Sequence, residues 1–368
     1  MESWAFPTGD EWGPEQVVYL SDPSAGLRSV VVVDNTAAGP AIGGVRMAPD
    51  VTPTEVFRLA RAMTFKNAAA GLRHGGAKAG IVADPAMDPA AKARLVRAFG
   101  AAMRPIVGYI PGPDMGLDET MMAHLRDETG RAVGLPPVLG GIPLDVLGAT
   151  GFGLAVAAEV AHDLGIVPLE GARVVVQGFG AVGRHAARFL TERGAVLVAA
   201  SDSRGAVVDP DGLDLATLTA LKADGRGVTD SPARSADPEE LIGLECDIWV
   251  PAARPDVFTA ANAGEVRARL VLQGANIPAT AEAEAHFHRR GVVSIPDFIA
   301  NAGGVICAAV EYAGGTVGQA FQTIEEKIRV NTREVLERSR ASGVEPREEA
   351  EAMAKERVRE AMGYRRRF

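Results

Sequence analysis

Two lysines, Lys66 and Lys78, lie in an apolar, glycine-rich stretch, Met63–Asp84, that reads MTFKNAAAGLRHGGAKAGIVAD. Thr52 and Glu55 form a capping box that predicts the start of a helix, and Lys66 falls on the apolar stripe of that helix. A lysine on such a face is rare unless it pairs with a negative charge or takes part in chemistry. The glycines near Lys78 allow the backbone to approach a ligand closely. Either lysine alone could be an ordinary solvent-reaching side chain, so the interpretation depends on the rest of the chain.

A third candidate for chemistry is Asp114, in the turn PGPDMG that follows the predicted strand IVGYI. Functional side chains are often displayed where a strand ends. An aspartate in PGPD is more often a turn residue whose carboxylate bonds the local backbone. Asp114 therefore also needs support from the elements around it.

The composition indicates an ordinary globular protein. The chain has 368 residues, of which 47% are hydrophobic and 23% charged, and this length suggests two domains. A net charge of −9 argues against a nucleic-acid or anionic-membrane partner. Cys246 and Cys307 lie in apolar segments and predict no disulfide, and the N-terminus has no signal-peptide pattern, so a cytoplasmic location is expected. The six histidines show no metal-ligand spacing, so no metal is predicted.

The first part of the chain is predicted to be an α/β domain. Strands are expected at VVYL, LRSVVVVDN and PAIGGV, followed by the helix that carries Lys66. A further strand, AGIVAD, should begin just after Lys78, and a second helix should cover Pro89–Met103. Strand IVGYI then leads to Asp114. The three candidate residues thus come from a helix end, a loop and a strand end.

The second part contains a dinucleotide-binding pattern. A strand at Val174–Val176 meets the glycines of GFGAVG, and a helix and a second strand that ends at Asp202 follow. In this setting GxGxxG is a strong signal, although a glycine-rich turn without a ligand is the alternative. The pyrophosphate would lie on the helix N-terminus, and Asp202 would accept hydrogen bonds from the ribose.

Alternating strands and helices continue beyond Asp202 and predict a doubly wound parallel sheet. From Gln319 to Met362 the pattern is helical, with a break at Ser342 and Gly343. The expected fold class is α/β with two domains, an N-terminal α/β domain and a Rossmann-type doubly wound dinucleotide-binding domain. The expected boundaries are residues 1–140 and 141–339.

At this point the sequence resembles the glutamate/leucine/phenylalanine/valine dehydrogenase family. The resemblance rests on an ordered set of motifs from about Gly39 to Gly304: GPAIGGVRM, MTFKNAAAGLRHGGAKAGI, GPDMG, ATGFG, QGFGAVG, PAA, GAN and NAGG. It implies NAD(P)-dependent oxidative deamination of an amino acid and the reverse reductive amination. It also implies that the first domain is the N-terminal α/β substrate domain and that the helices at about 340–368 return to it. A cleft between the two domains and a homo-oligomer, hexamer or octamer, are implied as well.

The resemblance carries roles to individual residues. Lys66 resembles the lysine that binds the substrate carboxylate, Lys78 the catalytic lysine, and Asp114 the acid that shuttles protons. The other residues implied to face the substrate are Gly43, Gly44 and Met47 in a substrate loop, the pocket residues Ile42, Gly112, Val305 and Ala308, and Asn301. Those implied to face the cofactor are Thr150, Gly178, Phe179, Gly180, Ala181, Val182, Gly183, Asp202, Ser203, Arg204, Ala252, Ala253 and Asn276.

The chemistry of that reaction suits these residue types. Oxidation requires a neutral amine, hydride departure from Cα and water attack on the iminium. Lys66 would fix the carboxylate, and a second lysine nearby would have a lowered pKa because burial and a neighbouring cation disfavour its charge. Neutral Lys78 could then activate water, and Asp114 could take the amine proton and return it to ammonia.

Two departures from the family pattern bear on the substrate. Glutamate-specific members resemble GPxKGG where this chain has Ile42, and they have a serine where the register gives Ala308. A second carboxylate would lack a partner here, so an apolar side chain of the leucine, valine or phenylalanine type is expected. Gly112 favours a bulky side chain on the substrate, because glycine leaves room in the pocket. GGAKAGI, SDSRG and DPDGLD look more like the glutamate branch, so glutamate stays open as the alternative.

Other choices also stay open. Asp202 favours NAD, whereas Ser203 and Arg204 could bind a 2′-phosphate, so NAD is slightly favoured over NADP. A catalytically silent amino-acid sensor would keep the fold but lose one of the three candidate residues, and all three are present. A decarboxylating hydroxyacid dehydrogenase would need a metal-binding carboxylate cluster, which the sequence does not offer.

Overall fold

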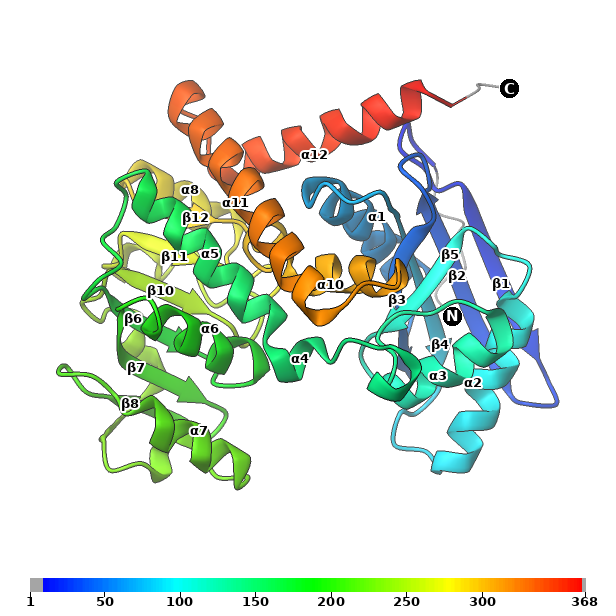
Figure 1. Ribbon diagram of the computed structural model, residues 1–368, viewed down its shortest axis with the longest axis horizontal. Helices are drawn as coiled ribbons and strands as arrows, with labels where there is room; N and C mark the ends of the chain where they lie inside the picture. Colours follow the sequence, from blue (N-terminus) through cyan, green and yellow to red (C-terminus); the bar gives the residue numbers. More distant parts are fainter. Residues whose placement is uncertain (1–8, 366–368) are drawn as a thin grey trace. The chain divides into compact units, whose positions relative to one another are not determined.

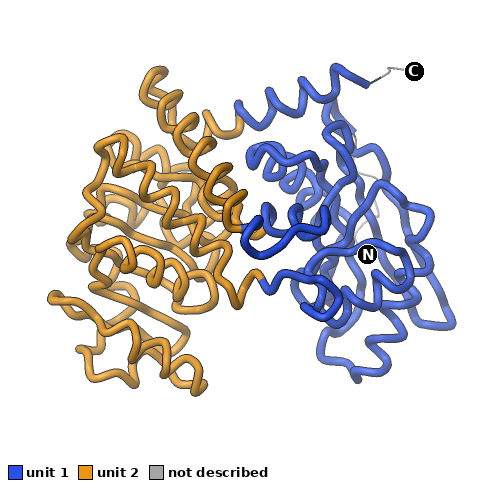
Figure 2. The backbone as a smooth tube through the Cα atoms, viewed as in Figure 1, with its two compact units in different colours: residues 1–143, 305–320, 352–368 blue, residues 144–304, 321–351 orange. Residues whose placement is uncertain are grey.

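The computed structural model describes residues 9–365. These residues form two compact units (Figure 2). Unit 1 consists of the described residues of Met1–Pro143, Val305–Ala320 and Ala352–Phe368, and unit 2 of Leu144–Gly304 and Phe321–Glu351. This division differs from the expected boundaries for Val305–Ala320, which belongs to unit 1, and for residues 340–351, which belong to unit 2.

Both differences have a local cause. In the first segment, Ala308 packs with Ile42 and Ile110 of unit 1. In the second, the Arg347 side chain is bonded to Asp297 of unit 2. Neither contact follows a periodic pattern in the sequence, so composition and periodicity do not predict to which unit these segments belong.

Unit 1 is built on a five-stranded mixed sheet with the order β1-β2-β4-β3-β5 (Figure 1). β1 and β2 pair antiparallel, as do β2 and β4, whereas β3 pairs parallel with both β4 and β5. The strands are β1 (Gln16–Asp22), β2 (Leu27–Asn35), β3 (Ala41–Ala48), β4 (Gly75–Val82) and β5 (Tyr109–Pro113), and the helices of its N-terminal part are α1 (Pro53–Ala69), α2 (Pro89–Met103) and α3 (Glu119–Thr129).

The helices of unit 1 cover opposite faces of this sheet. Val31 and Val33 of β2 pack in one apolar cluster with residues of α2 and α3. Their neighbours Val30 and Val32 pack in another, with Val56 and Ala60 of α1. Because successive strand residues point to opposite faces, α1 lies on one side of the sheet and α2 and α3 on the other. The helix predicted over Pro89–Met103 is confirmed as α2.

Unit 2 is built on a seven-stranded sheet with the order β12-β11-β10-β6-β7-β8-β9. Five strands from β12 to β7 pair parallel, and β8 and β9 add antiparallel pairs at one edge. The strands are β6 (Arg173–Gln177), β7 (Val196–Asp202), β8 (Gly205–Val208), β9 (Arg234–Ala236), β10 (Ile248–Pro251), β11 (Leu270–Leu272) and β12 (Val293–Ile295). The predicted α/β class with a parallel sheet is confirmed.

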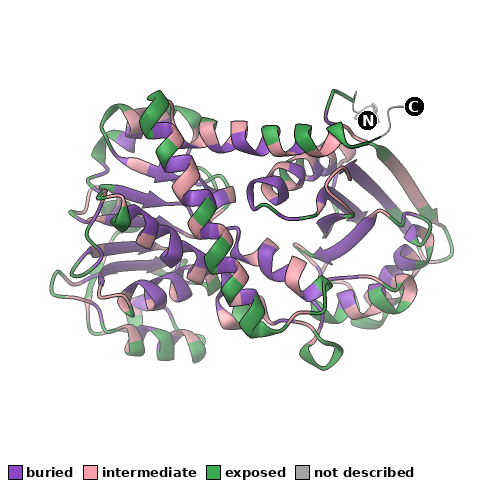
Figure 3. Ribbon diagram, turned by 45° about the horizontal axis from the view of Figure 1, so that its top comes forward, coloured by how far each residue is buried: buried purple, intermediate pink, exposed green. Residues whose placement is uncertain are grey.

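The remaining helices complete both units. In Figure 3 most strands are buried, and the helices expose one side. Within residues 9–365 no helix has both the length and the apolar character needed to cross a membrane. These helices are α4 (Leu144–Leu147), α5 (Ala149–Asp163), α6 (Ala181–Thr191), α7 (Leu215–Ala223), α8 (Ala281–Arg289), α9 (Asp297–Ala300), α10 (Gly303–Tyr312), α11 (Val317–Ser342) and α12 (Pro346–Gly363).

Candidate active site

Lys78 lies inside strand β4 and not in a loop before it, because β4 begins at Gly75. The glycines that suggested a loop are needed for close packing. A Cβ on Gly75 would lie 1.7 Å from the Asn35 carbonyl oxygen, and one on Gly76 would lie 2.0 Å from the Thr64 nitrogen of α1. The prediction of a loop was therefore wrong for a packing reason, and Lys78 has the fixed orientation of a strand residue.

Strand alternation gathers the candidate residues on one face. Ala77 and Ala79 pack on the side of α2 and α3, so Lys78 between them points to the side of α1. Along β3 the same alternation places Ile42, Gly44 and Arg46 on that side. On β5 it places Gly112 there, because Gly44 and Gly112 are register partners.

The same alternation corrects two expected substrate contacts. The strand predicted at PAIGGV is confirmed as part of β3 (Ala41–Ala48), whereas the resemblance implied a substrate loop that contains Gly43, Gly44 and Met47. Met47 is fully buried in the apolar cluster of α2 and α3. A Cβ on Gly43 would lie 1.7 Å from the Ala77 carbonyl oxygen, again on the face away from Lys78. Gly43 and Met47 therefore pack the sheet, and Gly44 is the residue of the motif that faces the site.

Lys78 and Asp114 form a direct ion pair, with 2.7 Å between Nζ and Oδ2. The Arg46 Nε lies 3.2 Å from the same oxygen, and the Arg46 guanidinium also pairs with Glu55 of α1. Burial raises the pKa of the Asp114 carboxyl, but attraction to Lys78 and hydrogen bonds to it, with Arg46 contributing, hold that pKa below 3.8. Arg46 was not among the predicted site residues, although it stands in the quoted motif four positions after Ile42.

Removing Arg46 should change how stability depends on pH. With Arg46→Gln, Asp114 loses one cation that lowers its pKa, so the free energy of unfolding at pH 7 should fall by about 2 kcal/mol. The pKa of Asp114 is depressed in the folded state. Its contribution is therefore present above its unfolded value near 3.8 and lost as pH falls through the folded value. In urea unfolding, the free energy of unfolding of Arg46→Gln should be lower than that of wild type by a constant amount from pH 7 down to about pH 4, and this difference should shrink below pH 4. Glu55→Gln, which removes only the pairing of Arg46 with Glu55, measures the part that this second pair contributes.

Lys66 lies in the last turn of α1 and is half-buried. The next residue, Asn67, is fully buried, and its side-chain amide donates to the Gly75 carbonyl at 2.6 Å and to that of Ile42 at 3.4 Å. These bonds fix the end of α1 against β3 and β4. Lys66 thus belongs to the helix that covers the Lys78 face. A cation in the last turn also suits the helix dipole, so position alone does not establish its role.

An apolar cluster lies on the same face of the sheet. It joins Ile42, Ile110, Val133 and Ala308, with Ala309 packed against them. A Cβ on Gly112 would lie 3.0 Å from Val133 Cγ2, which places Gly112 beside this cluster. Val305 is half-buried one turn earlier on α10, outside the cluster. Val133 was missed because it follows a helix end in a segment with no periodic pattern.

A buried glutamate holds the segment next to Val133. The Glu311 carboxylate of α10 is 7% exposed and accepts from the backbone N–H groups of Leu135 at 3.1 Å and Ile142 at 2.9 Å. Burial raises the pKa of Glu311. Helix α10 therefore supplies Ala308 to the apolar cluster. One turn later it supplies Glu311, which holds the segment that follows Val133.

The glycine motif of unit 2 is built to hold a phosphate group. Gly178 has φ 92°, and a Cβ on Gly183 would lie 1.9 Å from the Gly178 carbonyl oxygen. Helix α6 begins at Ala181, its N-cap Gly180 offers no side-chain bond, and no described atom lies within 4 Å of a Cβ built on Gly180. The first amides of a helix have no intrahelical acceptor and attract anions. The residues therefore fit a dinucleotide pyrophosphate, which Ala181 and Val182 would bind through backbone N–H groups.

Phe179 and Asp202 both make hydrogen bonds within unit 2. The N–H groups of Gly178 and Phe179 both donate to the Ser201 carbonyl, and the Phe179 ring is 1% exposed in the core. The Asp202 carboxylate, with its side chain 6% exposed, accepts from Lys222 Nζ at 2.8 Å and from the backbone N–H groups of Arg204 and Val228. Asp202 therefore connects the segments that follow β7 and α7.

The other predicted cofactor residues lie at carboxyl ends of the parallel strands or close to them. Ser203 and Arg204 are exposed in the turn after β7. Ala252 and Ala253 follow β10, and the Ala253 Cβ lies 2.7 Å from a Cβ built on Gly178. Asn276 is exposed in the segment after β11. Ligands of open α/β sheets bind at this edge.

Thr150 and Asn301 also belong to unit 2. Thr150 is half-buried in the first turn of α5, with Oγ1 3.4 Å from a Cβ built on Gly304. Asn301, assigned to the substrate, is 5% exposed, and its amide donates to the Asn276 side chain at 3.2 Å. Its immediate structural task is to hold Asn276. Among residues 9–365 no group of three or more metal-ligating side chains is close enough to hold a metal ion.

Comparison with known proteins identifies one family along both parts of the chain. A model described as Glu/Leu/Phe/Val dehydrogenase, dimerisation domain, matches residues 14–131, and one described as Glutamate/Leucine/Phenylalanine/Valine dehydrogenase matches residues 140–366. The chain is 38% identical to the NADP-specific glutamate dehydrogenase of Saccharolobus shibatae over 80% of this chain and 72% of that relative. It is 39% identical to NAD-specific glutamate dehydrogenase A of Halobacterium salinarum over 76% and 67%. Among solved structures, the hetero-hexameric glutamate dehydrogenase from Thermus thermophilus in its leucine-bound form has a TM-score of 0.84 and 33% identity, covering 96% of this chain and 91% of that chain.

Proposed function

This chain belongs to the glutamate/leucine/phenylalanine/valine dehydrogenase family and is an NAD(P)-dependent L-amino acid dehydrogenase that acts on the CH–NH2 group, and from that premise we propose that its substrate has an apolar side chain. The apolar cluster of unit 1 is the observation that carries the proposal. Ile42, Ile110, Val133 and Ala308 are all buried and apolar. Ile42 and Ala308 stand where glutamate-specific members of the family have a lysine and a serine, so side chains of the leucine, valine or phenylalanine type suit these positions better than a second carboxylate.

We assign the reaction steps to the residues of the Lys78 face. Lys66 binds the substrate carboxylate, and bound NAD(P) supplies the hydride acceptor. Asp114 takes a proton from the substrate ammonium, and the neutral amine expels the Cα hydride to form an iminium. Lys78 removes a proton from water as that water attacks the iminium carbon, and it passes this proton to solvent. Asp114 then returns its proton to the carbinolamine nitrogen, and as ammonia leaves, the neutral Lys78 amine takes the hydroxyl proton, which yields the 2-oxo acid. The separation of 2.7 Å between Lys78 Nζ and Asp114 Oδ2 suits proton exchange between them.

Glutamate is the second candidate, because the two relatives described above are named glutamate dehydrogenases. Against it, a γ-carboxylate placed on the apolar cluster would lose its hydration without gaining a partner, which costs several kcal/mol. Glutamate could be the better substrate only if a cation outside the cluster of Ile42 and Ala308 reached that carboxylate.

Initial rates of nicotinamide reduction test the proposal directly. Leucine, valine, phenylalanine, tryptophan and glutamate are each offered with NAD and with NADP. Higher kcat/KM for the apolar substrates than for glutamate supports the proposal, and the reverse order rejects it. Binding of an amino acid without turnover with either dinucleotide would instead indicate an amino-acid-sensing subunit.

The cofactor is NAD or NADP, as in the relatives. We propose a slight preference for NAD, because the Asp202 carboxylate would repel the 2′-phosphate of NADP. The preference is only slight because the Lys222 ammonium pairs with this carboxylate and neutralises its charge. We also propose that the chain forms a homo-oligomer, a hexamer or an octamer, which the dimerisation-domain match supports.

Removing Lys222 should therefore strengthen discrimination against NADP. In Lys222→Gln the Asp202 charge is no longer paired, so kcat/KM with NADP should fall about tenfold relative to NAD, which corresponds to ~1.4 kcal/mol. Arg226→Gln is the matched control, because Arg226 pairs with Asp230 in the same region and not with Asp202. An equal fall with both dinucleotides would mean that Lys222 only supports the local fold.

A further inference from the structure

The segment after β11 contains a strained residue. Among the described non-glycine residues, Ile277 with φ 48° and Asp256 with φ 53° have positive φ. The left-handed conformation is unfavourable for a β-branched residue and is kept only where its surroundings impose it. Ile277 is 58% exposed, so packing of its side chain does not impose this conformation. Ile277 directly follows Asn276, one of the residues expected at the dinucleotide.

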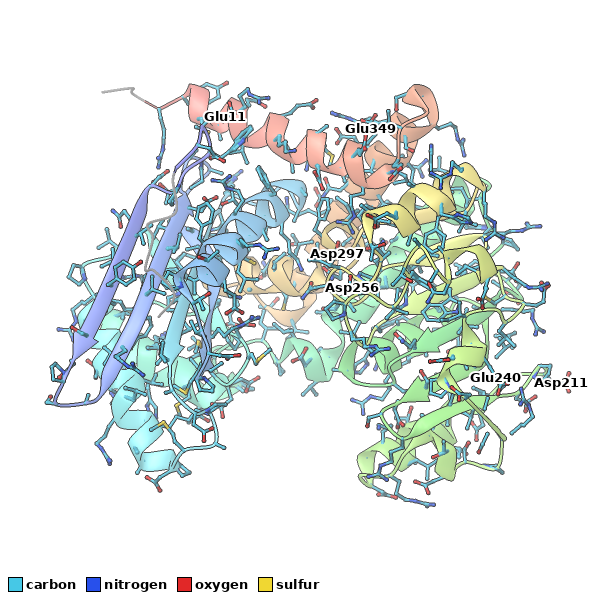
Figure 4. The ribbon with its side chains drawn as sticks, turned by 180° about the vertical axis from the view of Figure 1, so that it is seen from behind. Glu11, Asp211, Glu240, Asp256, Asp297 and Glu349 are labelled. Atoms are coloured by element: carbon cyan, nitrogen blue, oxygen red, sulfur yellow. The ribbon has the colours of Figure 1, made fainter. Side chains whose placement is uncertain are left out.

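Hydrogen bonds on both sides of Ile277 hold its backbone. Its N–H donates to Asp297 Oδ2 at 3.0 Å, and its carbonyl accepts from the Asp256 N–H at 3.0 Å. Both aspartates are labelled in Figure 4. Asn301 completes the set by donating to the Gly274 carbonyl at 3.3 Å and to the Asn276 side chain. The Gly274–Ile277 segment therefore takes its shape from Asp297, Asp256 and Asn301.

Asp297 is in turn held by Arg347 from the start of α12. One Arg347 nitrogen, Nη2, lies 2.8 Å from Asp297 Oδ1 and 2.8 Å from Gln273 Oε1, and its Nε pairs with Glu284. The guanidinium also stands 5.4 Å from the centre of the Phe298 ring. Asp297 is 6% exposed and Glu284 is 4% exposed. Arg347 is therefore the cation that makes two buried carboxylates tolerable at this place.

We propose that Arg347 is a positioning residue that acts through Asp297 to hold Ile277 in the left-handed conformation and so presents Asn276 to the dinucleotide. The ligand part of this inference rests on the proposed role of Asn276. Without Arg347, the carboxylates of Asp297 and Glu284 lose the cation that they share, and Glu284 keeps only its hydrogen bond from Gln273. Asp297 then turns away or takes up a proton, Ile277 relaxes to negative φ, and Asn276 leaves its position.

Hydrogen–deuterium exchange of the full-length protein tests the first step without any ligand. In Arg347→Met, peptides that cover residues 273–279 should exchange at least about tenfold faster than in wild type, since the Ile277 N–H loses its fixed acceptor. Arg329→Met is the matched control, because Arg329 pairs with Glu159 and Asp163 of the same unit and should leave these peptides unchanged. Unchanged exchange in Arg347→Met would overturn the proposal.

Dinucleotide binding tests the second step. Titration of NADH and NADPH, followed by nicotinamide fluorescence, should show a Kd about tenfold higher in Arg347→Met than in wild type or Arg329→Met. Faster exchange at 273–279 with an unchanged Kd would overturn the ligand part. The exchange result alone does not depend on what the protein catalyses, so a failure of the proposed substrate is distinguishable from a failure of this inference.

A glycine at position 277 separates positioning from general stability. Glycine adopts positive φ without strain, so Ile277→Gly should restore most of the lost affinity in the Arg347→Met background. A merely destabilised protein would not be restored by removing an exposed side chain, so absence of rescue rejects the inference. If Arg347→Met does not fold, Asp297→Asn carries the same test, because it keeps the shape and removes the charge that Arg347 binds.

Discussion

Replacing Lys78 with alanine should lower kcat for amino acid oxidation by about a thousandfold or more, as expected when a general base is removed. Lys78 is 6% exposed and its amine lies 2.7 Å from Asp114 Oδ2, so bulk water should not replace this amine as the general base in the variant. Arg46 still pairs with the same aspartate oxygen, so the fold should persist. The measurement is the steady-state rate with the best amino acid of the substrate panel, together with the thermal unfolding midpoint.

Two further variants make the assignment of Lys78 specific. Lys78→Arg keeps a cation beside Asp114, but a guanidinium does not act as a base near neutral pH, so it should be nearly as inactive as alanine. An active arginine variant would mean that only the charge is needed. Lys92→Ala is the matched control, because Lys92 lies on α2 and bonds the Pro85 carbonyl, away from Asp114. Wild-type activity in Lys78→Ala would leave another residue as the base.

The pairing of Lys78 with Asp114 was predictable from the sequence only through the resemblance. The two residues are separated by a helix and two strand segments, and no periodic pattern joins them. Their common face follows from strand alternation once β3, β4 and β5 are adjacent. Alternation also explains why Met47 does not face the site. The role of Met47 came from the resemblance, whereas its position on β3 points its side chain to the face opposite to that of Arg46.

The dinucleotide half was predicted better because its signal is local. The glycines of GFGAVG are fixed by the turn itself, and φ 92° at Gly178 matches that expectation. The partners of Asp202, Lys222 and Val228, were not predicted because they lie further along the chain. Whether an acid at a strand end is open to a ligand depends on which later residues fold over it, and a single sequence does not carry that information.

Longer-range anchors were beyond sequence reasoning for the same reason. Glu311 bonds the segment at Leu135, and Arg347 bonds Asp297, at separations for which neither helical nor strand periodicity gives a signal. Both are charged residues in helices, and such residues usually face solvent. Their burial becomes visible only when the partner backbone or carboxylate is seen beside them.

Gly44→Ala should reduce kcat about a hundredfold, because a displacement of about 1 Å at a reacting group has an effect of that size. A Cβ on Gly44 would lie 2.7 Å from the Asp114 Cβ and 3.2 Å from Lys78 Nζ. Real side chains do not approach so closely, so Asp114 or Lys78 must move and their pairing at 2.7 Å must lengthen. Steady-state kinetics with the best substrate measures the loss, and the thermal midpoint shows whether the fold is retained.

Gly112→Ala gives the contrast that makes the Gly44 result interpretable. Gly112 is the register partner of Gly44 on β5, but a Cβ there would lie 3.0 Å from the Val133 methyl Cγ2 and would crowd the apolar cluster. It should reduce kcat/KM for phenylalanine by ~10-fold relative to valine, within the range that one methyl group gives in a pocket. Gly44→Ala should instead affect all side chains alike. A change of selectivity in both variants, with kcat unchanged in both, would contradict this assignment. Gly44 would then belong to the side-chain pocket, and the reaction would not need the present geometry of the ion pair between Lys78 and Asp114.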